Sequence, residues 1–187
     1  MPTDRTLFIT AKPTLTWYSP TFARIASMQY TQGDTNPNMP NLVNPVTGDI
    51  RLGRMPSTPG FTDNVDITIA LDSSAILDST GTHVVAQWAP ANDGGMSGQP
   101  PATAYCWFIN NPVPGMPIDY TAISVPGMST SVDIYSNVLI DDNTPDDKPG
   151  QPSKYTFCLG LSVWTSQGPR VFVPIEPQII GKGVGSK

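Results

Sequence analysis

Seven consecutive residues alternate large aliphatic side chains with small or polar ones, and they read Val65-Asp66-Ile67-Thr68-Ile69-Ala70-Leu71. Successive side chains of a β-strand point to opposite faces, so this pattern predicts a strand with one buried face and one outward face. A second, longer stripe reads Tyr155-Thr156-Phe157-Cys158-Leu159-Gly160-Leu161-Ser162-Val163. We expect the odd-numbered aliphatic residues of both stretches to be buried between two sheets, with Thr156, Cys158, Gly160 and Ser162 on the polar face.

Strand signals of this kind recur along the 187 residues, with turn residues between them. They cover residues 7–10, 15–18, 25–30, 50–52, 65–71, 83–89, 104–109, 120–125, 132–140, 155–164 and 171–175. Only one of the 15 acidic residues is Glu, and Pro is abundant at 21 residues, so strong helix formers are scarce. The sequence therefore predicts an all-β chain, an antiparallel two-sheet β-sandwich of jelly-roll type. Residues 1–187 are expected to form a single domain, with 181–187 as a flexible tail.

The connections between these strands are long, polar and rich in Pro and Gly. Residues 31–49, 54–64, 90–101 and 141–154 lack strand or helix patterns, and loops of such length are uncommon unless they bind a ligand or become ordered in an assembly. Residues 73–78 follow Asp72, a plausible helix N-cap, and predict a single helical turn.

Charge excludes a nucleic-acid partner. The net charge is −5, and residues 55–147 hold eleven Asp with no Lys or Arg, whereas binding to a phosphate backbone needs clustered cations. The two ends of the chain carry the positive charge, so the positive ends of one copy and the negative middle of another have complementary sign, unless folding interleaves the segments. No apolar run reaches the length of a membrane span, and no signal peptide is evident, so we expect a cytoplasmic protein. In that compartment Cys106 and Cys158 are expected as buried thiols, with a disulfide as the alternative.

Catalytic and metal motifs are missing from the sequence. His83 is the single histidine, no Gly-x-Ser-x-Gly elbow occurs, and no Cys or His pair has zinc-ligand spacing. We therefore expect neither an enzyme nor a bound cofactor. One acidic loop is a candidate for calcium, because Ca²⁺ binds clustered oxygen donors: it holds Asp141, Asp142, Asp146 and Asp147. The alternative is a solvated turn in which these side chains support the backbone.

Two further residue types suggest binding surfaces. Aromatic residues that could stack on a sugar are Trp17, Tyr18, Trp88, Trp107 and Trp164, although each lies in a strand pattern where core packing is the alternative. Five methionines fall in loop-like contexts, where a flexible thioether suits either a protein contact or the closing of a sandwich end: Met39, Met55, Met96, Met116 and Met128.

Two segments carry a family resemblance. One joins Val65-Asp66-Ile67-Thr68-Ile69 to Val84-Val85-Ala86-Gln87-Trp88-Ala89, and the other joins Tyr155-Thr156-Phe157-Cys158-Leu159 to Val173-Pro174-Ile175-Glu176-Pro177-Gln178-Ile179-Ile180-Gly181-Lys182-Gly183. The second resembles the closing hairpin of bacterial β-sandwich proteins of the AidA/PixA inclusion-body type, with Glu176-Pro177 where Asp-Pro is more usual. The resemblance implies a non-enzymatic protein that accumulates in intracellular crystalline bodies.

Three functions follow from these observations. The first is a structural protein that self-assembles as a homo-oligomer or lattice, since low charge reduces repulsion between copies. The alternative is a loop-based binding module for a carbohydrate, with or without calcium. The third is a viral coat or decoration subunit, for which the sequence lacks the basic arm of a genome-packaging protein.

Overall fold

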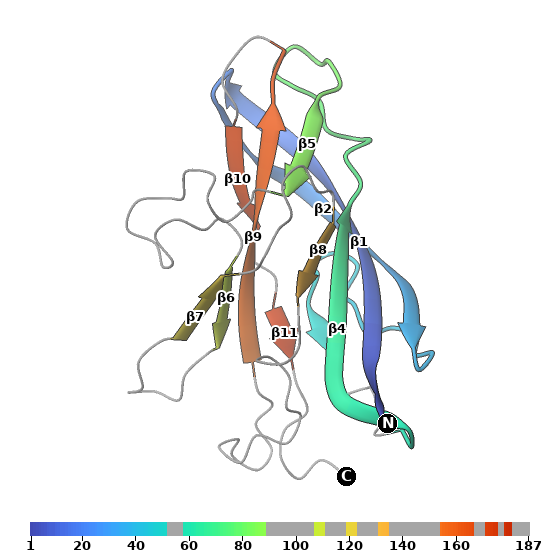
Figure 1. The fold of residues 1–187 in the computed structure, drawn as a ribbon. Coiled ribbons are helices and arrows are strands. Elements are labelled where there is room, and N and C mark those ends of the chain that lie inside the picture. Colours follow the sequence, from blue (N-terminus) through green and yellow to red (C-terminus); the bar gives the residue numbers. More distant parts are fainter. Residues whose placement is uncertain are drawn as a thin grey trace.

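The computed structural model describes residues 1–51, 58–88, 107–110, 119–122, 131–134, 154–166, 171–175 and 178–180. Within these ranges all regular elements are β-strands and none is a helix, which confirms the all-β prediction. The strands form two sheets that lie beside each other (Figure 1).

The smaller sheet has the strand order β2-β1-β4-β8. Its strands are β1 (Thr3–Ser19), β2 (Phe22–Asn36), β4 (Phe61–Leu71) and β8 (Ser131–Ile134). β1 and β2 form an antiparallel hairpin, whereas β1 and β4 run parallel. The expectation of purely antiparallel sheets is therefore wrong. The physical reason is the connection after β2, which passes through β3 of the other sheet and returns alongside β1 in the same direction.

The larger sheet is built around β9 (Lys154–Trp164). Its path runs β3-β11-β9-β6-β7, and β5 and β10 also pair with β9. The bounds are β3 (Ile50–Arg51), β5 (Val85–Trp88), β6 (Trp107–Asn110), β7 (Asp119–Ala122), β10 (Val171–Ile175) and β11 (Gln178–Ile180). β3 and β11 are parallel, and the pairs that β9 makes are antiparallel.

Both sheets contribute to one buried apolar cluster. From β4 it takes the alternating aliphatic residues, of which Val65, Ile67 and Ile69 are at most 1% exposed. From β9 it takes Leu161 and Val163, both fully buried. The alternation in these two strands therefore predicts correctly which of their described side chains lie in the core. The indole of Trp88 on β5 also joins the sheets, because its Nε1 donates a hydrogen bond of 3.0 Å to the carbonyl oxygen of Ile69.

The strands of the first hairpin are longer than their sequence pattern indicates. Residues 7–10 and 15–18 are expected as separate strands, yet they belong to the single strand β1, which runs through Pro13. Proline lacks a donor for the sheet ladder and is tolerated where one side of a strand is open. Pro13 meets this condition, because the described pairing of β1 with β4 ends at Ala11 and only β2 continues beside it.

Several other boundaries also differ from expectation. Residues 31–36 and 61–64 are expected in loops but extend β2 and β4, since pairing with β1 satisfies their backbone. The predicted helical turn at 73–78 is wrong: Asp72 Oδ1 accepts the amide of Ser74 at 2.9 Å, and a tight turn follows in which Ile76 N bonds Ser73 O at 3.0 Å. Ile76 is buried there, and burial of this side chain holds the segment as a loop against the core. The strand expected at 83–89 begins only at Val85.

The predicted polar face of β9 is only partly correct. Ser162 lies on the face opposite Leu161 and Val163, but it is fully buried, and its cross-strand neighbour Gln87 is 5% exposed. This part of the larger sheet is therefore covered on both faces, which a period-two pattern with Ser and Gln cannot reveal.

The segment after β2 folds back as a cover for the strand edge. Its backbone joins β2 where Tyr30 N donates to Pro45 O at 2.8 Å, and Leu42 N donates to the side chain of Gln32 at 2.7 Å. Tyr30 is 4% exposed, and the buried Gly48 lies against its ring. The predicted unstructured loop is thus a packed segment.

Candidate functional site

A pocket opens on the outward face of the smaller sheet, where β1, β2 and β4 lie side by side. We call it the outer pocket, and its lining is Thr6, Leu7, Phe8, Asp34, Asp66 and Thr68, around a volume of about 390 Å³. The parallel register sets Thr6 beside Asp66 and Phe8 beside Thr68. Phe8 is 40% exposed. The pocket therefore combines an aromatic ring with two carboxylates and two hydroxyls.

A bulge in β2 gives the outer pocket its shape. Leu7 pairs with Thr35 and Ile9 pairs with Gln32, so Gly33 and Asp34 together oppose the single residue Phe8. Such bulges redirect side chains and are frequent beside binding sites. A side chain at the first of these positions would displace the Phe8 ring, because a Cβ on Gly33 would lie 2.8 Å from Cδ1 of Phe8. The close approach lets the Phe8 ring lie over the β2 backbone, with Asp34 next to it.

The turn between β1 and β2 carries a second exposed group, at the opposite end of these strands (Figure 1). We call it the hairpin tip, and it consists of Tyr18, Phe22 and Arg24. The two rings have centroids 5.5 Å apart, and Cζ of Arg24 lies 5.9 Å from the Tyr18 centroid and 5.4 Å from that of Phe22. Tyr18 is 64% exposed and Phe22 46%. The hairpin tip therefore presents a cation stacked on two solvent-facing aromatic rings.

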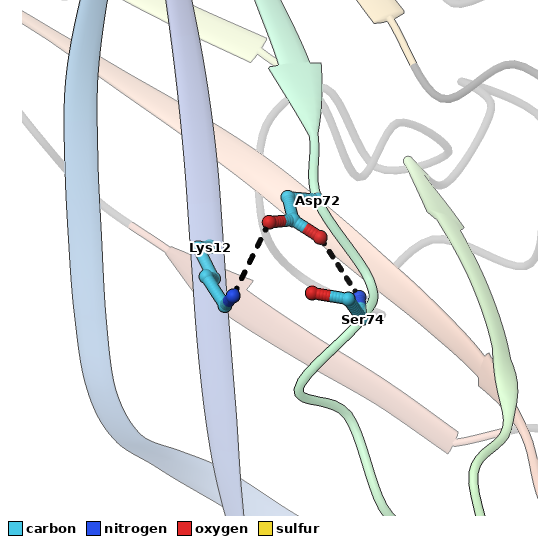
Figure 2. Close-up of polar contacts among 3 residues, drawn as sticks. All are labelled: Lys12, Asp72 and Ser74. Carbon is cyan, nitrogen blue, oxygen red and sulfur yellow. Dashed lines mark hydrogen bonds and ion pairs between the residues drawn. The ribbon is translucent and has the colours of Figure 1, made fainter.

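A small polar cluster lies on the face between these two sites. Lys12 on β1 approaches Asp72 just after β4, with Nζ 3.4 Å from Oδ2, and Asp72 Oδ1 accepts the Ser74 amide (Figure 2). Hydrogen bonds from Ser74, and then the charge of Lys12, lower the pKa of the Asp72 carboxyl below its ordinary value. Because the ion pair is neutral overall, it adds no net charge to this face.

Asp78 anchors the loop between β4 and β5. Its side chain is 4% exposed, and Oδ1 accepts hydrogen bonds from Thr80 N at 2.8 Å, Thr80 Oγ1 at 2.6 Å and Thr82 N at 3.0 Å. Oδ2 accepts the amide and hydroxyl of Ser166, beyond the end of β9. The hydrogen bonds from Ser166, followed by those from Thr80, hold the pKa of Asp78 well below its ordinary value. With its oxygens occupied by these donors, this carboxylate has a structural role.

The calcium candidates Asp141, Asp142, Asp146 and Asp147 lie outside the described residues, as do Cys106 and four of the five loop methionines. Cys158 belongs to β9, and its side chain is likewise outside the description. Met39 is partly buried and packs against the core. Within the described ranges, no three His, Cys, Asp or Glu side chains gather as metal ligands, and no helix is suited to cross a bilayer.

The aromatic candidates separate into core and surface residues. Trp88 is fully buried, so a sugar platform at this position is wrong, whereas Trp17 is partly buried and packs against the core with its Nε1 donating to Leu77 O at 2.7 Å. Tyr18 is exposed as a platform would require, but it belongs to the hairpin tip. His83 is exposed and forms an isolated bridge with Leu77.

The sequence patterns missed Phe8 and Asp34 as site residues. The available signal was Gly33, since a glycine inside a strand often marks a bulge or a close approach of the backbone. Comparison with known proteins adds no relative: no family model, no curated protein and no solved structure matches this chain. The outer pocket and the hairpin tip are therefore the features of the described residues that bear on function.

Proposed function

We propose that this chain is a non-enzymatic structural protein that self-assembles, and that its two sheets are the layers of a β-sandwich. The observation that supports self-assembly is the hairpin tip. Tyr18 and Phe22 expose 64% and 46% of their surfaces at the turn between β1 and β2, with Arg24 stacked on both rings. Aromatic residues and Arg are enriched in protein interfaces and dominate their binding energy.

The charge of the chain supports the same proposal. Only 13% of the residues are charged, about half the usual share. Two copies therefore repel each other weakly, and burial of the exposed rings stabilises an association by roughly 25 cal/mol for each Å² removed from water. Self-association removes this apolar surface from solvent without requiring a ligand.

Sedimentation velocity over a wide range of protein concentration tests the proposal. We expect wild-type protein to form oligomers as concentration rises, and the double variant Tyr18→Ser/Phe22→Ser to form them less. Val46→Ser is the matched control, because Val46 is 73% exposed in the segment after β2, away from the hairpin tip. A wild-type chain that stays monomeric at every concentration contradicts self-assembly.

Electron microscopy of overexpressing cells distinguishes the kinds of assembly. Ordered intracellular bodies agree with the function implied by the AidA/PixA resemblance. Closed shells favour a coat or decoration subunit instead. Dispersed protein with no ordered structure, in cells that express the chain strongly, argues against both.

A second candidate function is carbohydrate binding, which the outer pocket favours. An aromatic ring such as that of Phe8 can stack on the apolar face of a sugar ring, and carboxylates and hydroxyls form hydrogen bonds with the sugar hydroxyl groups. A glycan array with wild-type protein and Phe8→Ala tests it: binding that disappears in the variant supports the pocket as a sugar site. A blank array with folded wild-type protein contradicts this candidate.

A further inference from the structure

The outer pocket and the hairpin tip have complementary chemistry. The tip carries the cation of Arg24 over two aromatic rings, and the pocket carries Asp34 and Asp66 beside the exposed ring of Phe8. A guanidinium group forms its strongest hydrogen bonds with carboxylates and also stacks on aromatic faces. The pocket volume of about 390 Å³ is large enough for a side chain of this size.

The two sites of one copy cannot meet. Phe8 and Tyr18 lie ten residues apart on the same strand, which corresponds to about 33 Å at the rise of an extended chain. Pairing with β2 along this length keeps β1 extended. The hairpin tip can therefore enter only the pocket of another molecule.

Both sites also lie on the same face. Even-numbered residues of β1 form its outward row from Phe8 to Thr16, because the bulges within this length fall in β2. The last bulge, between Trp17 and Ser19, falls on β1 at Tyr18, whose ring lies beside Arg24, and Arg24 pairs with Thr16 of the outward row. Between them lie Thr10, Thr14, Thr16 and the neutral Lys12–Asp72 pair. No net charge on this stretch opposes the approach of a second copy.

We propose that two copies pair face to face, with the hairpin tip of each in the outer pocket of the other. This inference rests on the proposed self-assembly and names its contact. Because tip and pocket share one face, a two-fold arrangement with antiparallel β1 strands makes both contacts at once. Such an interface is closed, and the second contact forms at the high effective concentration set by the first.

Charge-reversal variants test the pairing by sedimentation velocity. We expect Arg24→Glu and Asp34→Arg each to weaken dimerisation about tenfold or more, since each brings like charges together. Arg51→Glu is the matched control, because it makes the same charge change at an exposed position on β3 of the other sheet and is expected to leave the dimer intact. High salt is expected to weaken the wild-type dimer through screening.

An equimolar mixture of Arg24→Glu and Asp34→Arg gives the decisive measurement. In a mixed pair, the glutamate tip of one copy meets the arginine pocket of the other, and the native Arg24 meets the native Asp34. We expect the mixture to dimerise more tightly than either variant alone. This rescue also shows that neither variant lost assembly through misfolding.

Each other result has a defined meaning. If both variants alone dimerise as well as wild type, the proposed contact is wrong, whereas self-assembly through another surface stands. If both are monomeric and their mixture is also monomeric, the contact is again overturned. If wild type itself never associates, the proposed function fails and the contact fails with it.

Discussion

Substitution of Gly48 by Ala measures how tightly the segment after β2 covers the core. Gly48 has a φ of 76°, and a Cβ at this position would lie 2.5 Å from Cζ of the Tyr30 ring and 2.6 Å from Cε2. The left-handed backbone costs Ala about 1–2 kcal/mol, and forcing a methyl group against a packed ring costs about 1–3 kcal/mol more. We expect Gly48→Ala to lower the free energy of unfolding by about 2–5 kcal/mol, because Tyr30 is buried and cannot move into solvent.

Gly60→Ala is the matched control for this experiment. Gly60 also has a positive φ, 90°, but no atom lies within 4 Å of its hypothetical Cβ, so its substitution carries only the backbone cost. Urea unfolding followed by circular dichroism gives both values, and the excess for Gly48→Ala is the contact with Tyr30. The excess is expected to shrink in a Tyr30→Leu background, as in a double-mutant cycle. Equal losses for the two glycine variants would refute the packing of Tyr30 on Gly48.

Three further predictions concern the core and two titrating groups. Ile67→Ala is expected to cost about 2–5 kcal/mol in urea unfolding, whereas Thr68→Ala on the outward face costs about 0.5 kcal/mol or less, and similar losses would contradict the assigned faces. Hydrogen bonding keeps the folded-state pKa of Asp78 below its ordinary 3.8, so its contribution to stability is present above that pH and is lost as pH falls below it. Asp78→Asn is therefore expected to show a weaker acid dependence of unfolding than wild type, and an unchanged acid dependence would exclude this group as its source. Burial raises the pKa of Tyr30 well above its ordinary 10.0, so the free energy of urea unfolding is expected to fall as pH rises beyond 10. Tyr30→Phe is expected to remove this fall, and an unchanged pH dependence in the variant would exclude Tyr30 as its source.

Local patterns predicted the all-β class and much of the core. The aliphatic residues of 65–71 alternate in sequence and are buried in the structure, and Leu161 and Val163 behave in the same way. Burial of one face is a local requirement, because each strand must place alternate side chains against the core. The alternation of apolar and polar residues therefore predicts these strands even when the strands that pair with them are unknown.

Sequence patterns did not predict strands that are held by backbone pairing and not by burial of one face. Residues 31–36 contain no apolar side chain, yet they extend β2 because β1 satisfies their backbone groups. Pro13 interrupts a strand signal, yet β1 continues through it because β4 no longer pairs there. Both outcomes depend on the neighbouring strand, which no single segment specifies.

The outer pocket depends on the same non-local information. Its five outward residues come from three strands, and they meet only because β1 and β4 are parallel with Thr6 opposite Asp66. An antiparallel pair, as the sequence suggested, would reverse β4 and bring other residues beside Phe8. Gly33 indicates a bulge in the sequence, but the bulge places Asp34 beside the pocket only because Phe8 lies opposite it on β1. A site whose residues come from several strands can therefore be recognised only after the pairing of those strands is known. Substitution of Phe8, Asp34 or Arg24 then distinguishes a face that binds a partner from one that is merely solvated.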